Sequence, residues 1–155
     1  MSPRVSAGIL LYRQRAGSVE VLLAHPGGPL FAKKDEGHWT IPKGEPGPGE
    51  ALEAVAVREF AEEIGSAVRG ALHPLGWIKQ KGGKIVHGWA VETEEMTFAE
   101  IKSNSLSMEW PPRSGRFQEF PEVDRAEFFS LEEARKKIKE TQRPFLDRLE
   151  KLVRG

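Results

Sequence analysis

The stretch Gly44–Ser66, GEPGPGEALEAVAVREFAEEIGS, decides how the rest of this chain is interpreted. It begins as a loop rich in Pro and Gly and continues as a predicted helix that carries Glu59, Glu62 and Glu63. At about 100° per residue, these three carboxylates share roughly one third of the helix circumference and project together. The opposite side of the helix carries an apolar stripe suited to packing on a sheet, formed by Val57, Phe60 and Ile64.

The acidic face of this helix costs stability unless it binds a cation. Glu59 and Glu63 are spaced i,i+4, where like charges repel. Glu62 and Glu63 also lie near the predicted C-terminal end of the helix, where the macrodipole disfavours anions. A hard divalent cation with oxygen ligands would reverse the sign of these interactions. The pattern therefore favours a metal site over the alternative of a solvated acidic surface.

The fixed residues of the stretch follow a regular pattern: Gly44, five residues, Glu50, seven residues, Arg58-Glu59, and then Glu62-Glu63 before Gly65. This pattern resembles the signature of the Nudix hydrolases, G-x5-E-x7-R-E-U-x-E-E-x-G-U, where U is apolar. The chain departs from the signature only in the last apolar position, where a serine stands. The resemblance implies an enzyme that hydrolyses a pyrophosphate bond in a nucleoside diphosphate linked to a further group X.

The resemblance also implies roles for the residues of the pattern. Clustered carboxylates beside a glycine loop suit Mg²⁺ or Mn²⁺ shared with substrate phosphates. Glu59 is a candidate to orient or deprotonate water, and Arg58 is expected to orient neighbouring carboxylates. Glu50 is expected to complete the metal shell or to pair with Arg58. The candidate metal ligands are Glu59, Glu62, Glu63, Glu50 and the backbone carbonyl of Gly44.

Many Nudix enzymes add an acidic side chain from a loop that precedes a late strand. Glu122 lies six residues before Phe128 and best matches this placement, with Glu119 as the second choice. An ordinary turn residue is the alternative for either. Whether Glu59 or Glu122 is the general base stays open at this point.

Composition limits the class of protein. A length of 155 residues suits one domain, residues 1–155, with a sizeable core. The 23 basic and 23 acidic residues balance, which makes nucleic acid an unlikely main partner. No cysteine is present, so thiolate ligands and disulfides are excluded. No signal peptide and no apolar segment of about 20 residues is found, so the prediction is a cytoplasmic protein that does not enter the membrane.

The order of predicted elements indicates an α/β fold, an α/β/α sandwich with a mixed β-sheet, in agreement with the resemblance. Alternation and turn residues predict strands, with the first two forming a hairpin. A capping box at Ser130 indicates the start of one C-terminal helix. Pro144 fits the first turn of a second, which is the last helix. The predicted strands are Val5–Tyr12, Val19–Ala24, Ala71–Lys79, Lys84–Thr93 and Ala126–Phe129, and Ser107–Gly115 is predicted as a strand that ends in a turn at Pro111-Pro112; the predicted loops are His25–Gly37 and Arg116–Asp124, and a short helix is predicted around Phe98–Lys102.

Candidate substrate-binding residues lie on both sides of the pattern. Lys43 directly precedes Gly44 and could meet a phosphate, with a solvated surface lysine as an equal alternative. Lys79 and Lys81 could compensate a long phosphate chain, as could Lys84, and a solvated basic hairpin is the alternative. The Pro42–Glu45 run, PKGE, and these lysines resemble members that accept polyphosphates.

An aromatic wall is the second candidate for substrate contact. His87 and Trp89 alternate along one predicted strand and should share a face, which Trp77 could reach from the preceding strand. Such a wall could stack a nucleobase, but tryptophans at this spacing are more often core residues.

The resemblance thus favours a dinucleoside polyphosphate or a nucleoside triphosphate as the small-molecule substrate. An ADP-ribose-type nucleotide sugar is the alternative within the family. Two other classes also remain: a non-catalytic nucleotide sensor, and a module that grips RNA 5′ phosphates. The complete set of carboxylates argues against the first, and the neutral charge argues against the second. The oligomeric state is not predicted.

Overall fold

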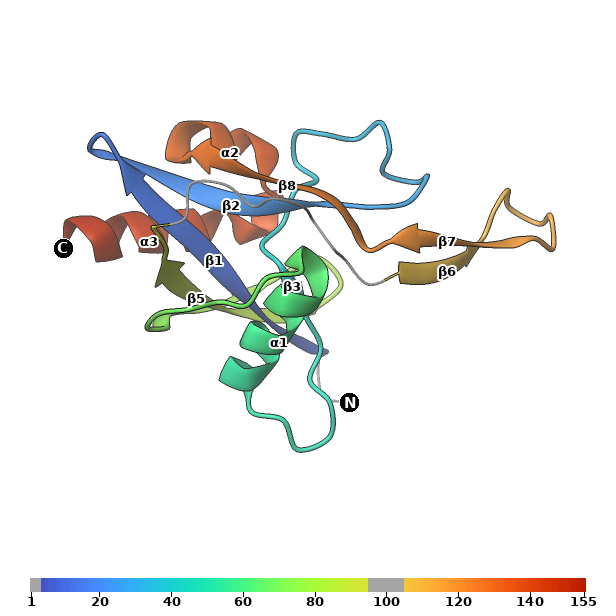
Figure 1. Ribbon diagram of the computed structural model, residues 1–155, viewed down its shortest axis with the longest axis horizontal. Coiled ribbons are helices and arrows are strands. Elements are labelled where there is room, and N and C mark those ends of the chain that lie inside the picture. The colour runs from blue at the N-terminus through green and yellow to red at the C-terminus, as the bar shows by residue number, and fades with distance from the viewer. Residues whose placement is uncertain (1–3, 95–104) are drawn as a thin grey trace.

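The computed structural model of the protein describes residues 4–94 and 105–155. Two sheets and three α-helices are present in this part of the chain (Figure 1). The elements in chain order are β1 (Val5–Arg15), β2 (Ser18–Pro26), β3 (Lys43–Gly44), α1 (Leu52–Ile64), β4 (His73–Lys79), β5 (Ile85–Glu92), β6 (Ser105–Glu109), β7 (Phe117–Pro121), β8 (Val123–Ser130), α2 (Leu131–Lys137), the 3₁₀ turn η1 (Glu140–Gln142) and α3 (Arg143–Arg154).

The main sheet is mixed, with the strand order β4-β5-β1-β2-β8 and with β3 added beside β1. The β1–β5 pair is parallel, whereas the other pairs are antiparallel. One edge of β1 serves two partners: its end at Tyr12–Arg15 pairs with β2, and Ala7 and Gly8 pair with β3. The segment that leads to β3 is bridged to β2 through Thr40 and Ala24, and the loop that leads into α1 follows β3.

Helices cover both faces of this sheet. Helix α1 packs on one face through a cluster that includes Ile9, Leu11 and Phe60. Helices α2 and α3 pack on the other face, where Leu10 and Phe145 belong to a second cluster. Figure 1 shows α1 on one side of the strands and α2 with α3 on the other. The predicted α/β/α sandwich with a mixed sheet is therefore confirmed.

Local signals in the sequence account for several element ends. The first two strands form the predicted hairpin. The Ser130 side chain accepts a hydrogen bond from the backbone N–H of Glu133, as a capping box requires. Gly65 ends α1 in the left-handed conformation, with φ 85°, and Pro144 lies in the first turn of α3.

The prediction of a loop at Arg116–Asp124 is wrong. Residues 117–121 form strand β7, which pairs with β6, and β8 already begins at Val123. Pro121 is tolerated because it is the last residue of β7. The β6–β7 ribbon projects from the main sheet in Figure 1, and its Phe117 is 70% exposed. The helix predicted around Phe98–Lys102 lies outside the described residues.

Candidate active site

The apolar face of α1 fixes how the helix is rotated on the sheet. Val55, Phe60 and Ile64 are fully buried against the strands. Because side chains three or four residues apart share a face, Glu59, Glu62 and Glu63 are turned toward the loop that joins β3 to α1. The same burial that stabilises the helix therefore aims its carboxylates.

Gly44 and Glu59 are in close contact. A Cβ atom at residue 44 would collide with the carboxyl group of Glu59. Only glycine leaves room for this carboxylate beside the backbone of β3, which explains why the pattern begins with glycine. The contact places the Glu59 carboxylate beside the main chain of Gly44.

Arg58 holds the other parts of the site together. Its Nε and Nη2 atoms donate to the two oxygens of Glu50, at 2.7 and 2.8 Å. Its Nη1 atom donates to Glu59 Oε1 at 2.8 Å and to Glu62 Oε2 at 3.0 Å, and Nη2 also donates to the Glu45 carbonyl. These bonds raise the pKa of Arg58. The Arg58 guanidinium and the Gly47 backbone N–H hold the pKa of Glu50 at about 2.

Glu63 lies deeper, beside Lys43. Its Oε2 accepts a hydrogen bond from the Lys43 backbone N–H at 3.0 Å. Burial raises the pKa of Glu63 to about 8, and burial together with Lys84 and Lys139 lowers the pKa of Lys43 to about 8. Burial also raises the pKa of Glu59. A carboxylate whose charged form is disfavoured by burial is stabilised when a cation binds beside it.

The residues of this cluster have the chemistry of a magnesium site. Carboxylate oxygens and a backbone carbonyl are hard donors, which Mg²⁺ and Mn²⁺ prefer. In the part of the chain that the structure describes, no three such side chains already converge as metal ligands. Arg58 accounts for this, because its guanidinium engages both Glu59 and Glu62. A metal ion would therefore share these two carboxylates with Arg58.

Glu122 faces the same cluster from the bend between β7 and β8. It raises the pKa of both Glu59 and Glu63 through its negative charge. Glu122 and Glu63 also line one cavity of about 190 Å³ together with Lys43. Glu119, the second choice, is exposed on β7 and does not line this cavity. The structure thus brings Glu122, rather than Glu119, to the helix carboxylates.

Three lysines gather beside these carboxylates. Lys84 and Lys139 both lower the pKa of Lys43 through their positive charge, and Lys139 lines the cavity of Glu63 and Glu122. Burial and Lys84 lower the pKa of Lys139 in turn. Lys139 was not predicted, because nothing near it in the sequence indicates that the turn after α2 reaches the site.

A second cavity of about 480 Å³ adjoins the first through shared walls, Phe31 and Lys139. Lys81, a predicted substrate-binding residue, lines this second cavity and not the first. The rings of Phe31 and His38 lie 6.5 Å apart in its wall. Sequence reasoning treated the segment of Phe31 as a plain loop, since its Gly and Pro residues carry no signal for a cavity wall.

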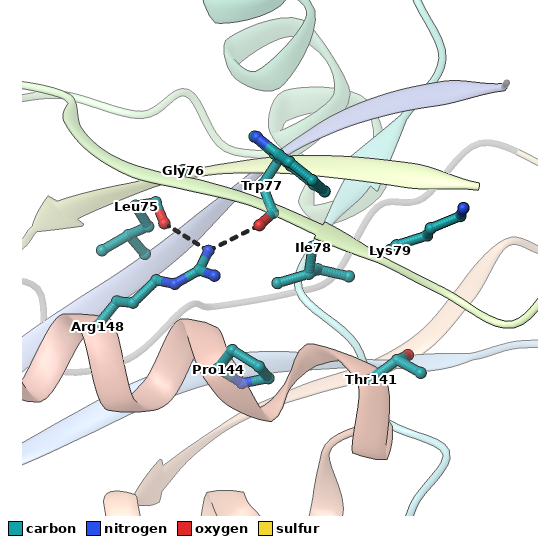
Figure 2. Close-up of a pocket in the computed structure, with 8 residues that line it drawn as sticks. All are labelled: Leu75, Gly76, Trp77, Ile78, Lys79, Thr141, Pro144 and Arg148. Carbon is teal, nitrogen blue, oxygen red and sulfur yellow. Dashed lines mark hydrogen bonds between the residues drawn. The ribbon is translucent and has the colours of Figure 1, made fainter. Parts of the chain in front are cut away.

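Lys79 is separated from this cluster. It is exposed on β4 and lines a cleft between β4 and α3, as Figure 2 shows. In that cleft Arg148 donates from Nη1 to the carbonyls of Leu75 and Trp77, at 2.9 Å each. Figure 2 shows the Trp77 ring on the far side of β4 from Arg148.

The predicted aromatic wall is divided between core and surface. Trp89 is 8% exposed and packs in the cluster under α1, so the core interpretation is confirmed for this residue. Trp77 is 55% exposed, and the core interpretation is wrong for it. His87 is half-buried, stacks on Trp89 with ring centroids 6.4 Å apart, and is the cross-strand neighbour of Trp77.

Comparisons with known proteins agree with this geometry. The family model of the NUDIX domain matches residues 2–149. A curated relative, the asymmetrical bis(5′-nucleosyl)-tetraphosphatase of Caenorhabditis elegans, is 43% identical over 58 residues, which are 37% of this chain and 38% of that protein. The match therefore spans well under half the length of the relative.

Solved structures share the fold over nearly the whole chain. A binary complex of the C. elegans Ap4A hydrolase has a TM-score of 0.70 at 24% identity, covering 98% of each chain. The NUDIX domain of Shewanella oneidensis NrtR, in complex with ADP ribose, has a TM-score of 0.70 at 12% identity, covering 99% of this chain and 90% of that one. In the described part of the chain, no helix has the length and apolarity that a membrane span requires.

Proposed function

The chain belongs to the NUDIX domain family, and from this membership we propose that it is a metal-dependent pyrophosphohydrolase. The substrate is a nucleoside diphosphate linked to a group X, with dinucleoside polyphosphates and nucleoside triphosphates as the favoured class. The observation that carries the proposal is the approach of three carboxylates to one another: Glu63 and Glu122 line one cavity, and Glu59, which lies against Gly44, is close enough to raise the pKa of Glu63.

The metal-binding residues in this proposal are Glu59, Glu62, Glu63 and the carbonyl oxygen of Gly44, with Glu50 in support through Arg58. The metal is Mg²⁺ or Mn²⁺, which neutralises phosphate charge and lowers the pKa of water when bound. The fit rests on hard oxygen donors, on the room that Gly44 leaves for Glu59, and on the burial that raises the pKa of Glu63 to about 8.

The protein's own residues then have distinct tasks. Arg58 orients Glu59 and Glu62 by its two hydrogen bonds from Nη1. Glu59 or Glu122 accepts the proton of the attacking water, since both carboxylates lie at the same cluster. Glu59 is the more fixed of the two, because the Arg58 guanidinium and the Gly44 backbone confine it.

Charge at the site supports a polyphosphate substrate. Besides burial, Lys84 and Lys139 lower the pKa of Lys43, and Lys84 lowers the pKa of Lys139, so these positive charges are unfavourable to one another until an anion binds between them. A chain of several phosphates supplies that charge. The curated relative in C. elegans is a tetraphosphatase of dinucleoside substrates, which points to the same class. A cytoplasmic location belongs to this proposal.

An ADP-ribose-type substrate is the second candidate. It is favoured by one observation, the shared fold with an NrtR domain that is in complex with ADP ribose. A catalytically silent sensor is disfavoured, because every carboxylate of the pattern is present.

The test is Mg²⁺-dependent hydrolysis over a panel of substrates, with the products identified by mass. The panel contains diadenosine tetraphosphate, canonical and oxidised nucleoside triphosphates, ADP-ribose and a 5′-triphosphorylated RNA. The matched control is Glu62→Gln, which removes one charge and keeps the shape of the side chain. Turnover of a polyphosphate that is lost in the variant is expected. Binding of a substrate without turnover of any member of the panel would contradict the enzyme proposal and would support a nucleotide sensor.

A further inference from the structure

His25 is a buried histidine that the proposed chemistry does not use. It lies near the end of β2 and has no exposed surface. The β2–β8 register shifts beside it: His25 pairs with Arg125, and Pro26 pairs with Val123, so Asp124 is an extra residue in β8. Such a bulge re-aims a side chain. Here the side chain of Asp124 reaches the His25 ring.

Both ring nitrogens of His25 face acceptor atoms. Nδ1 lies 2.8 Å from Oδ1 of Asp124, and Nε2 lies 2.6 Å from the carbonyl oxygen of Lys34. A carbonyl oxygen carries no proton, so Nε2 must donate. The partner of Nδ1 is the carboxyl group of Asp124, so the ring bridges Asp124 and the Lys34 carbonyl.

The surroundings of this pair are partly polar. The Asp124 side chain is 33% exposed to water, and Arg125 Nε lies 3.8 Å from its Oδ1. The Trp39 ring packs edge-on against the His25 ring, with the ring centroids 5.1 Å apart.

The two partners of His25 belong to two separate walls of the catalytic cavity. Lys34 lies in the loop of residues 27–38, which supplies Phe31 to the cavity. Asp124 lies in β8, two residues after Glu122, which lines the cavity from the bend before β8. The backbone N–H of Gly27 donates to the Glu122 carbonyl at 2.9 Å. His25 thus connects the loop and the strand directly beside the point where they meet.

We propose that His25 is a positioning residue, whose ring fastens the loop of residues 27–38 to the start of β8 and so fixes Glu122 at the α1 carboxylates. The effect on turnover rests on the proposed function, whereas the fastening itself does not. A buried ring with one partner on each segment fits this task, because loss of the ring removes the link on both sides.

The first experiment reads the protonation of the ring in the wild-type protein. A long-range ¹H–¹⁵N spectrum is expected to show a proton on Nε2 of His25, because the Lys34 carbonyl oxygen can only accept. A ring without a proton on Nε2 would overturn the proposal. This experiment needs no substrate, so it succeeds or fails independently of the hydrolase assignment.

The second experiment uses His25→Gln, whose single amide group cannot reproduce the two ring nitrogens that reach opposite partners. Backbone amides of residues 27–38 are expected to exchange faster, by at least about tenfold, than in the wild type. His73→Gln is the matched control, because His73 is exposed on β4. Unchanged exchange in the loop of a folded His25→Gln protein would contradict the fastening.

The third experiment asks whether His25 acts through Glu122. On a substrate that the wild type hydrolyses, His25→Gln is expected to lower kcat by about 10- to 100-fold while KM changes little. In a Glu122→Gln background the same change is expected to cost much less, because the two residues form one unit. Additive losses would mean that His25 does not act through Glu122.

Discussion

Helix α1 presents two faces of opposite character to its surroundings. The face toward the sheet is apolar and excludes water, whereas the other face gathers like charges around Arg58. The first stabilises the fold, and the second lowers stability until a cation binds. Because both faces belong to one helix, the effect of a substitution on one face can be compared with the effect of a substitution on the other. The buried residues are Val55, Ala56, Phe60 and Ile64.

The largest effect is expected from the apolar face. Phe60→Ala removes a side chain that is 1% exposed and leaves a cavity between α1 and β1. The expected loss in the free energy of unfolding is about 3–5 kcal/mol, measured by urea denaturation. Glu53→Gln, in the first turn of the same helix, is expected to change it by less than about 0.5 kcal/mol. Similar losses in the free energy of unfolding for both variants would mean that burial of the apolar face does not stabilise this helix.

The next effect belongs to the acidic face. Gly44→Ala would place a methyl group where the Glu59 carboxylate lies, so the carboxylate must move. A displacement of about 1 Å is expected to lower kcat about 100-fold, close to 2.7 kcal/mol. Gly47→Ala is the control in the same loop, because its Cβ would lie 3.6 Å from Glu50 Oε1, an ordinary contact.

The two faces of α1 have separate roles if Gly44→Ala loses turnover and keeps the stability of the wild type. Equal rates in the two glycine variants would show instead that Glu59 need not lie against residue 44. A loss of stability as large as that of Phe60→Ala would show that the loop, rather than the carboxylate, is the part affected.

The sequence predicted both faces of α1, because helical periodicity and local spacing determine them. It also predicted the first hairpin and the caps at Ser130 and Gly65, which depend on neighbouring residues. Strand β7 was missed because its pairing with β6 is exposed and has no buried face to impose a clear alternation. The signal for a strand is weak where no core lies beneath it.

The sequence could not predict contacts between segments that lie far apart along the chain. Glu122 could be named from its spacing to Phe128, but its approach to Glu63 depends on how β8 pairs with β2. Lys139 reaches the same cavity only because α2 ends beside Trp39, where the Lys139 N–H donates to the Trp39 carbonyl. The pairing of His25 with Asp124 spans 99 residues and depends on a bulge with no sequence signature.

A smaller effect is expected from Glu63→Gln in the metal-free protein. Burial raises the pKa of Glu63 from its ordinary 4.5 to about 8. Its contribution to stability is therefore fully present below pH 4.5 and is lost as the pH rises through about 8. The variant removes this loss and is expected to be more stable at pH 8 by on the order of 1 kcal/mol.

Thermal unfolding from pH 5 to pH 8, with and without Mg²⁺, measures this effect. The wild type should lose stability with rising pH in EDTA and regain it when Mg²⁺ is added. The variant should show neither change. A variant that is less stable than the wild type at pH 8 in EDTA would mean that the acidic face does not lower stability.

The smallest effect is expected from Arg58→Lys, which tests how the acidic face is held in the absence of metal. Lysine cannot reproduce the fork that joins Glu50, Glu59 and Glu62. Because the side chain of Arg58 is 36% exposed, the loss in stability should stay below about 1 kcal/mol.

Since Arg58 competes with a metal for two carboxylates, the Kd for Mg²⁺ should fall a few fold, by roughly 0.5 kcal/mol, in calorimetric titration. Turnover should fall nonetheless, because the released carboxylates are less well oriented. Weaker Mg²⁺ binding in the variant would instead show that Arg58 pre-organises the ligands more than it competes with the metal for them.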